Sequence, residues 1–174
     1  MQSTFKTLFF RIHNSNFVVS VSLLFLLFLG FFVIWSLLYF SILEKWDVIF
    51  IPTPNDTLMT RPIYIQILLA VIIGPSIETL IFQKWLYKLL SLVKWLKRRK
   101  LLIMIIGALA FGAIHIYSLS YIVFTVFMGF LFMFAYVARI GKNPFRTVFV
   151  LHALANLFVI LTTPITNEIF GIII

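Results

Sequence analysis

The sequence feature that most limits how this chain can fold is a run of 27 residues, Phe17 to Leu43, whose apolar character is almost unbroken. As an α-helix such a run would be about 40 Å long, whereas the hydrocarbon core of a bilayer is about 30 Å thick. The run is too long for the core of a signal peptide, and no small-residue cleavage site follows it. We therefore predict a retained transmembrane helix that tilts or protrudes from the membrane.

Further apolar segments predict that the chain crosses the membrane several more times. Charged residues make up only 11% of the 174 residues, against about 25% in ordinary globular domains. The additional predicted spans are 63 to about 82, 101 to about 118, about 121 to 138, and 145 to about 163. We predict an all-α, polytopic transmembrane helical bundle of about five spans, with residues 1–174 forming a single integral membrane domain.

The segments between the spans are more polar and predict loops or surface helices. Residues 83–100 alternate lysines with tryptophan and leucine, which predicts an interfacial helix on anionic headgroups. The other segments are a short polar start (1–16), an extramembrane loop with Asp47, Pro52, Pro54 and Asp56 (44–61), a loop (139–146), and a weakly amphipathic tail with Pro164 and Glu168.

The positions of the basic residues predict the orientation in the membrane. With five spans, 12 of the 14 Lys and Arg residues fall on one side, leaving only Lys45 and Arg61 on the other. The positive-inside rule then places the N-terminus in the cytoplasm, and we expect a bacterial inner (cytoplasmic) membrane. The net charge of +9 is thereby explained by the lipid bilayer as partner, without nucleic acid. The chain has no cysteine, which excludes disulfides, thiolate metal sites and thiol nucleophiles.

One carboxylate interrupts the apolar pattern. Glu78 is the only acid inside a predicted span, and a charge near the bilayer centre costs roughly 2.5–3.5 kcal/mol on insertion scales. Pro75 precedes it by one turn, which predicts a kink and frees the carbonyl of Val71 as an acceptor. Because such residues usually face a bundle interior and serve a function, we interpret Glu78 as the chemical centre.

Apart from Gln66, two histidines and an asparagine complete the strongly polar set at membrane depth. His115 falls in the third predicted span and His152 in the fifth, with Asn156 one turn after His152 on the same helix face. A poorly solvated glutamate is a competent general base near neutral pH, and a histidine can orient the attacked water. The second histidine and the asparagine can hydrogen-bond an oxyanion. We expect a polar cavity among the second, third and fifth spans, open toward the cytoplasm or laterally to lipid.

These residues carry a family resemblance. Glu78, Phe111-x-x-x-His115 and His152-x-x-x-Asn156, in this order and each on its own apolar helix, resemble the CPBP family (CAAX prenyl proteases and bacteriocin-processing enzymes), also called Abi proteins. The resemblance covers Gly74 to about Phe158, within a family-like core of about 62–163. It implies a glutamic-type intramembrane endopeptidase acting on a membrane-associated peptide or protein. In it, Glu78 and His115 would position the water, and His152 and Asn156 would support the oxyanion.

Two positions depart from the family pattern Glu-Glu-x-x-x-Arg. Thr79 stands in place of the second glutamate and Gln83 in place of the arginine, so both keep hydrogen-bonding capacity and lose a charge. We expect both to be supporting residues, and Phe111 to be a packing residue. The departures leave open a catalytically degenerate member that acts as a membrane peptide-binding or bacteriocin-immunity protein. A proton or ion carrier is disfavoured because no chain of acids crosses the membrane.

Zinc is the alternative cofactor. Glu78, His115 and His152 would match a three-ligand catalytic zinc site with one open position. If Glu78 bound the metal, however, no second carboxylate would remain to act as base, since Thr79 cannot replace it. We therefore favour metal-free catalysis by Glu78.

Overall fold

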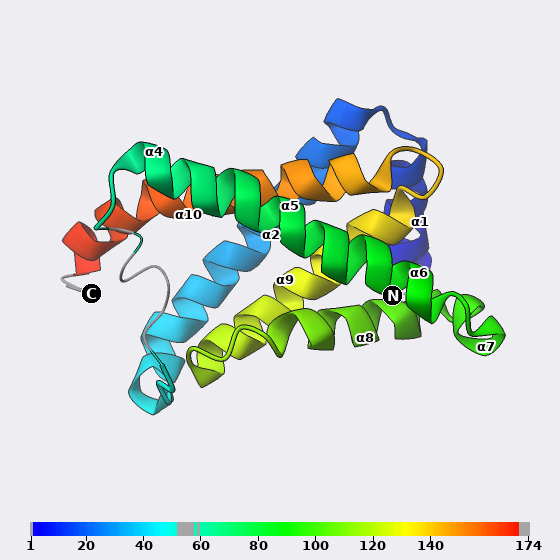
Figure 1. Cartoon of the computed structure of the whole chain (residues 1–174). Helices are drawn as coiled ribbons and strands as arrows, with labels where there is room; N and C mark the ends of the chain where they lie inside the picture. Colours follow the sequence, from blue (N-terminus) through cyan, green and yellow to red (C-terminus); the bar gives the residue numbers. More distant parts are fainter. Residues whose placement is uncertain (1, 52–57, 59, 171–174) are drawn as a thin grey trace.

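The computed structural model describes residues 2–51, 58 and 60–170, and within them the chain is an all-α bundle with no β-strand beyond one isolated bridge (Figure 1). Four helices are long and apolar enough to cross a membrane: Phe17–Trp46, Ile63–Leu90, Leu119–Ala138 and Pro144–Thr163. A fifth apolar helix, Lys100–Gly112, has only 13 residues. The predicted fold class is confirmed, with the third span shorter than expected.

The helices follow one another with few long connections. The chain begins with α1 (Gln2–Asn14) and α2 (Phe17–Leu38), which is continued by η1 (Tyr39–Leu43) and η2 (Glu44–Trp46). The next five elements form one continuous helix, which we call the rod: α4 (Ile63–Gln66), η3 (Ile67–Ile73), α5 (Gly74–Glu78), η4 (Thr79–Trp85) and α6 (Leu86–Leu90). The last four helices are α7 (Lys94–Lys97), α8 (Lys100–Gly112), α9 (Leu119–Ala138) and α10 (Pro144–Phe170). The predicted loop prolines and Asp56 lie outside the described residues, whereas the predicted tail continues α10 as far as Phe170.

The rod from α4 to α6 packs along the helix α10, and α8 and α9 form a helical hairpin, of which α8 lies below the rod in Figure 1. The rod does not end near Phe82, as the sequence suggested, but continues to Leu90. Consequently Gln83 is fully buried instead of lying on the membrane surface, and only Lys94–Lys97 remains as a separate short helix in the basic segment. Residues 83–90 therefore form the end of the rod, and the single helix predicted for 83–100 is divided into this end and Lys94–Lys97.

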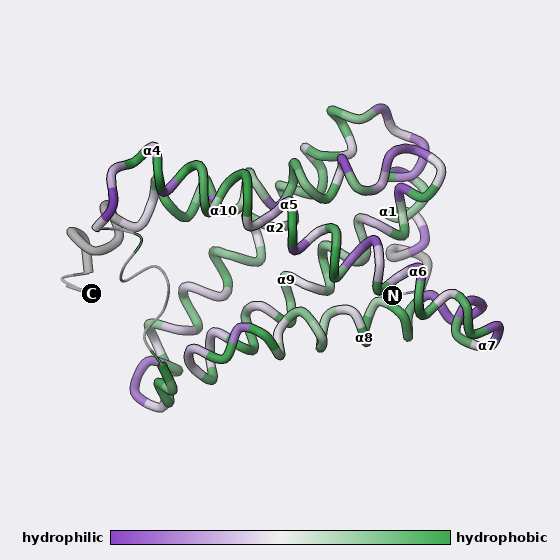
Figure 2. The backbone as a smooth tube through the Cα atoms, in the orientation of Figure 1, coloured by the Kyte–Doolittle hydropathy of each residue, from purple (hydrophilic) through white to green (hydrophobic). Residues whose placement is uncertain are grey.

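The basic segments gather at one end of the bundle. Polar residues are concentrated around α1 and α7 at this end (Figure 2). The buried Arg139 donates to the carbonyls of Ile12 and Ser15, and the guanidinium of Arg146 lies 4.5 Å from the ring centroid of Phe17. The predicted polar start is thus a helix, α1, whose Ile12 is fully buried. The contacts place the N-terminal and 139–146 segments together, as the charge pattern predicted.

The α8–α9 hairpin is closely packed because glycines lie at the crossing. A Cβ atom on Gly129 would lie 2.8 Å from the Cβ of Phe111 and 3.1 Å from the backbone of Ala108. Glycine therefore permits a helix approach that other residues would prevent, as expected for membrane helices. The helix α8 ends at Gly112, so His115 lies in the turn before α9 and not inside a span, which corrects the prediction.

Candidate active site

Glu78 lies at the end of α5, between two π-helical stretches of the rod, η3 and η4. Widened turns of this kind are frequent at functional sites. Because the rod continues to Leu90, twelve residues separate Glu78 from its basic end, which corresponds to about 18 Å of helix. Glu78 thus lies deep in the bundle, at a depth comparable with the end of α8.

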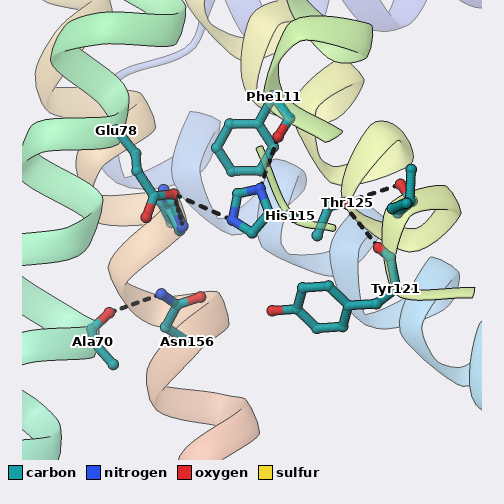
Figure 3. Close-up of polar contacts among 9 residues, drawn as sticks. Ala70, Glu78, Phe111, His115, Tyr121, Thr125 and Asn156 are labelled. Atoms are coloured by element: carbon teal, nitrogen blue, oxygen red, sulfur yellow. Dashed lines mark hydrogen bonds and ion pairs between the residues drawn. The ribbon is translucent and has the colours of Figure 1, made fainter. Parts of the chain in front are cut away.

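The three titratable side chains converge on one point. The Nε2 atom of His152 lies 3.7 Å from Oε2 of Glu78, and Nε2 of His115 lies 4.0 Å from the same oxygen. Figure 3 shows Glu78 on the rod and His115 on the α8–α9 turn pointing toward each other. The side chains of Glu78, His115 and His152 are 27%, 14% and 5% exposed. These distances are longer than a direct hydrogen bond. They are short enough for one water molecule to hydrogen-bond to both side chains.

The hydrogen bonding of His115 fixes which ring nitrogen faces the site. Its Nδ1 lies 2.7 Å from the carbonyl oxygen of Phe111, and a carbonyl can only accept, so Nδ1 carries the proton. In neutral imidazole, Nε2 is then the acceptor, and this is the nitrogen that faces Glu78. Phe111 also packs its ring against that of His115, with centroids 4.7 Å apart. Phe111 therefore packs against His115, as predicted, and its backbone carbonyl also fixes the orientation of the His115 ring.

His152 is held mainly by aromatic rings. Its imidazole stacks on Phe132 at 4.4 Å between centroids and meets the edge of Phe111 at 5.9 Å. Its Nδ1 is buried without a hydrogen-bond partner in the described part of the chain, whereas Nε2 faces the polar site. Since a buried N–H without a partner is costly, the favoured neutral tautomer carries its hydrogen on Nε2. The two histidines thus present opposite groups, an acceptor from His115 and a donor from His152.

Asn156 has a backbone partner that the sequence did not reveal. Its Nδ2 donates to the carbonyl oxygen of Ala70 at 2.7 Å. In the π-helical register of η3, the N–H of Gly74 donates to the carbonyl oxygen of Leu69, five residues earlier. In the same register, the N–H of residue 75 would donate to the carbonyl oxygen of Ala70. That residue is Pro75, which has no N–H. The freed acceptor is therefore Ala70, not Val71 as predicted for an α-helical register, and Asn156 satisfies it.

This hydrogen bond yields a prediction for Asn156. Asn156→Leu keeps the size of the side chain but removes the donor, leaving the Ala70 carbonyl without it. We expect a loss of about 1 kcal/mol of stability, as is usual for interhelical hydrogen bonds in membranes. Thermal unfolding in detergent measures the change. An unchanged unfolding temperature in Asn156→Leu would contradict this structural role and leave only the predicted oxyanion role.

Thr79 and Gln83, the two departures from the family pattern, are both fully buried on η4. The hydroxyl of Thr79 and both polar atoms of the Gln83 carboxamide have no hydrogen-bond partner among the described residues. They lie on the face of the rod that packs into the bundle and do not line the cavity that contains Glu78. The supporting role predicted for these two residues therefore stays a prediction.

Their surroundings predict that apolar replacements are tolerated. A buried polar group without a partner is destabilising, so Thr79→Val and Gln83→Leu should keep or raise the unfolding temperature. Changes in peptide cleavage should stay within about threefold, because neither side chain lines the cavity. Measuring both properties in the double variant is the check. A large loss of cleavage at unchanged stability would show that these side chains do support catalysis.

The converging side chains lie in a cavity of about 570 Å³, within the range of small-ligand sites. Glu78, His115, His152 and Asn156 all line it, together with apolar side chains from α2, the rod and α9. The lining also includes Tyr121, which the sequence analysis missed, and its hydroxyl points into this space in Figure 3. The sequence could have indicated this position, because the turn is short and Tyr121 comes only six residues after His115. The lining extends to Arg61, near the end of the rod opposite the basic end, and the predicted opening toward the cytoplasm or laterally to lipid stays a prediction.

The arrangement of the donor atoms bears on the zinc alternative. Among the described residues, no group of three or more His, Cys, Asp and Glu side chains is arranged so that it could hold a metal ion. Glu78, His115 and His152 approach one another, but their donor atoms do not form such a set. Zinc stays the alternative to the metal-free catalysis that the sequence analysis favours.

Comparison with known proteins gives one match. The family model described as Rce1-like, type II CAAX prenyl endopeptidase, matches residues 60–158, more than half of the chain. The matched stretch contains Glu78, both cavity histidines and Asn156, which confirms the resemblance inferred from the motifs. Searches of curated proteins and of solved structures gave no match.

Proposed function

Because this chain belongs to the Rce1-like family of type II CAAX prenyl endopeptidases, we propose that it is an intramembrane endopeptidase in which Glu78 activates a water molecule. The observation that carries the proposal is the convergence of both histidine Nε2 atoms on one carboxylate oxygen of Glu78. In a cavity largely lined by apolar side chains, this is the arrangement that base-catalysed hydrolysis requires.

The first step uses the acceptors of the site. A water between Glu78 and His115 donates one hydrogen to the carboxylate and the other to the unprotonated Nε2 of His115. Its oxygen lone pairs then face the substrate carbonyl. As the oxygen attacks the carbonyl carbon, one water proton passes to Glu78, and a tetrahedral intermediate with a negatively charged oxygen forms.

The second step uses the donors. The Nε2–H of His152 hydrogen-bonds the oxyanion, which develops where the low-polarity cavity makes such a bond most effective. A second donor is available if the other N–H of Asn156 reaches the same oxygen. Glu78 then delivers its proton to the amide nitrogen, the carbon–nitrogen bond breaks, and the products are a new carboxyl group and an amine. No atom is needed beyond the peptide and one water.

The substrate class follows from the cavity and the membrane setting. An intramembrane cavity with apolar lining and a polar centre suits a membrane-associated peptide or protein with apolar side chains next to the cleaved bond. We propose metal-free catalysis, with zinc as the alternative that the test below distinguishes.

Orientation is also part of the proposal. The basic end of the bundle should face the cytoplasm of a bacterial inner membrane, by the positive-inside rule. Since the chain has no cysteine, single variants Lys97→Cys and Lys45→Cys allow a clean test with a membrane-impermeant thiol reagent. In intact cells, Lys45→Cys should react and Lys97→Cys should be protected. The reverse pattern would overturn the orientation.

The decisive experiment for the activity uses the purified full chain in lipid nanodiscs. A mixture of synthetic peptides, with and without a prenylated cysteine, is incubated with wild type and with Glu78→Ala, His115→Ala and His152→Ala, and fragments are identified by mass spectrometry. We expect cleavage by the wild type alone, unchanged by a metal chelator. Equal turnover in all four proteins would reject the assignment, and loss of wild-type activity with the chelator would favour zinc.

A further inference from the structure

His115 differs from the other two central residues in how it is supported. Glu78 and His152 are held on long helices, whereas His115 lies in the turn that follows the end of α8 at Gly112. Its position therefore depends on whatever holds the turn from 113 to 118 in place.

Asp47 is the main polar contact of that turn. One carboxylate oxygen accepts from the backbone N–H of Ser120 at 2.9 Å, and the other accepts from the hydroxyls of Ser118, at 2.9 Å, and Ser120. Tyr39 of η1 donates to the second oxygen at 3.4 Å. We call these four residues the Asp47 cluster. It joins the end of the first span to the start of α9, 71 or more residues later in the chain.

The segment after Asp47 extends this connection along the turn. The backbone N–H of Phe50 donates to the carbonyl of Tyr117 at 2.7 Å, and Leu119 donates to the carbonyl of Val48 at 3.0 Å. Ile49 and Ser118 form an antiparallel bridge. Because Val48, Ile49 and Phe50 are 51–76% exposed, hydrogen bonds and not buried side chains hold this segment against the turn.

The carboxylate is well suited to this role. Burial alone would raise the pKa of Asp47, but the hydrogen bonds from Ser120 and Ser118 outweigh it and hold the pKa below its usual value. Asp47 is therefore ionised at neutral pH, and charge-assisted hydrogen bonds are stronger than neutral ones.

We propose that Asp47 is a positioning residue that fixes the α8–α9 turn so that Nε2 of His115 faces Glu78. The inference rests on the proposed function for its kinetic consequence, but its structural part stands alone. Asp47 lies outside the stretch 60–158 that matches the family model, so this support is supplied by another part of the chain.

The first test is spectroscopic and needs no substrate. The chain has only three histidines, His13, His115 and His152, so ¹⁵N-histidine labelling of the full chain in nanodiscs gives a simple spectrum. In Asp47→Ala, exchange of the Nδ1–H of His115 with water should rise at least about tenfold, because its turn opens more often. The signals of His13 and His152 should not change. Asp47→Asn, which can still accept from Ser120, should restore most of the protection, and Glu44→Ala is the matched acidic control on the same segment.

The second test replaces the cluster by a covalent bond. Paired residues of an antiparallel bridge have Cα atoms about 4.5–5.5 Å apart, within the range that a disulfide spans. In Asp47→Ala with Ile49→Cys and Ser118→Cys, the oxidised protein should regain the protection of His115 and most of the cleavage rate, and the reduced protein should not. Cleavage of the peptide mixture by Asp47→Ala should fall roughly 10- to 100-fold in kcat with little change in KM.

The outcomes separate the two proposals. If His115 is unchanged in Asp47→Ala, or if all three histidines change equally, the positioning role is wrong. If no peptide is cleaved by the wild type while the spectra change as expected, the proposed function fails and the positioning of His115 by Asp47 stands.

Discussion

Glu78→Gln is expected to lower peptide cleavage by about 10⁴-fold, the upper end of what general base catalysis contributes. Glutamine has the same shape but cannot take the proton from the water, so the loss should fall on kcat. A factor of this size corresponds to about 5 kcal/mol of activation free energy. Steady-state cleavage in nanodiscs measures it.

The stability of Glu78→Gln should rise or stay unchanged, although its rate of cleavage falls. Removing a carboxylate from the interior of a membrane bundle removes its desolvation cost, so the unfolding temperature of Glu78→Gln should be equal or higher. The matched control is Glu44→Gln, an exposed acid on η2, which should leave both properties unchanged. A Glu78→Gln protein that cleaves within about tenfold of wild type would remove Glu78 from the role of base.

Gly129→Val is expected to have the largest effect on stability. The new side chain would meet the backbone of Ala108 and the Cβ of Phe111, neither of which can rotate away. The α8–α9 hairpin must then separate, at about 3 kcal/mol, the upper end of the usual cost of overpacking. Because the carbonyl of Phe111 holds His115, cleavage should be lost as well.

Gly30→Val is the control for this variant. Gly30 lies within α2, and a Cβ atom there would have nothing within 4 Å. Thermal unfolding in detergent should therefore show a large decrease for Gly129→Val and none for Gly30→Val. Equal unfolding temperatures for the two variants would show that the close approach of α8 and α9 is not required.

The sequence predicted the helical bundle because membrane spans are determined locally, by the length and polarity of each segment. It failed at helix ends that tertiary contacts decide. The residues after Gly112 remain largely apolar, so hydropathy could not show that α8 stops there and that Tyr117 bonds to Phe50. Similarly, the amphipathic pattern could not show that the rod continues through residues 83–90, where the ammonium of Lys84 lies 5.7 Å from the ring centroid of Phe145.

The convergence of the central residues was also predictable, because an acid and two histidines within largely apolar stretches need a common polar environment. Their partners were not. Assigning Asn156 to the Ala70 carbonyl required knowing that the rod is π-helical before Pro75. The role of Asp47 depends on contacts across more than 70 residues of sequence, and no pattern within a single helix reveals such contacts.

The most direct test of the account is to let the purified chain cleave the peptide mixture in H₂¹⁸O with a metal chelator present, and to weigh the new carboxyl termini by mass spectrometry. We predict one ¹⁸O atom in each new terminus for the wild type and no such product for Glu78→Gln. Equal labelled product from both proteins, or none from the wild type with any peptide, would contradict hydrolysis by water that Glu78 activates.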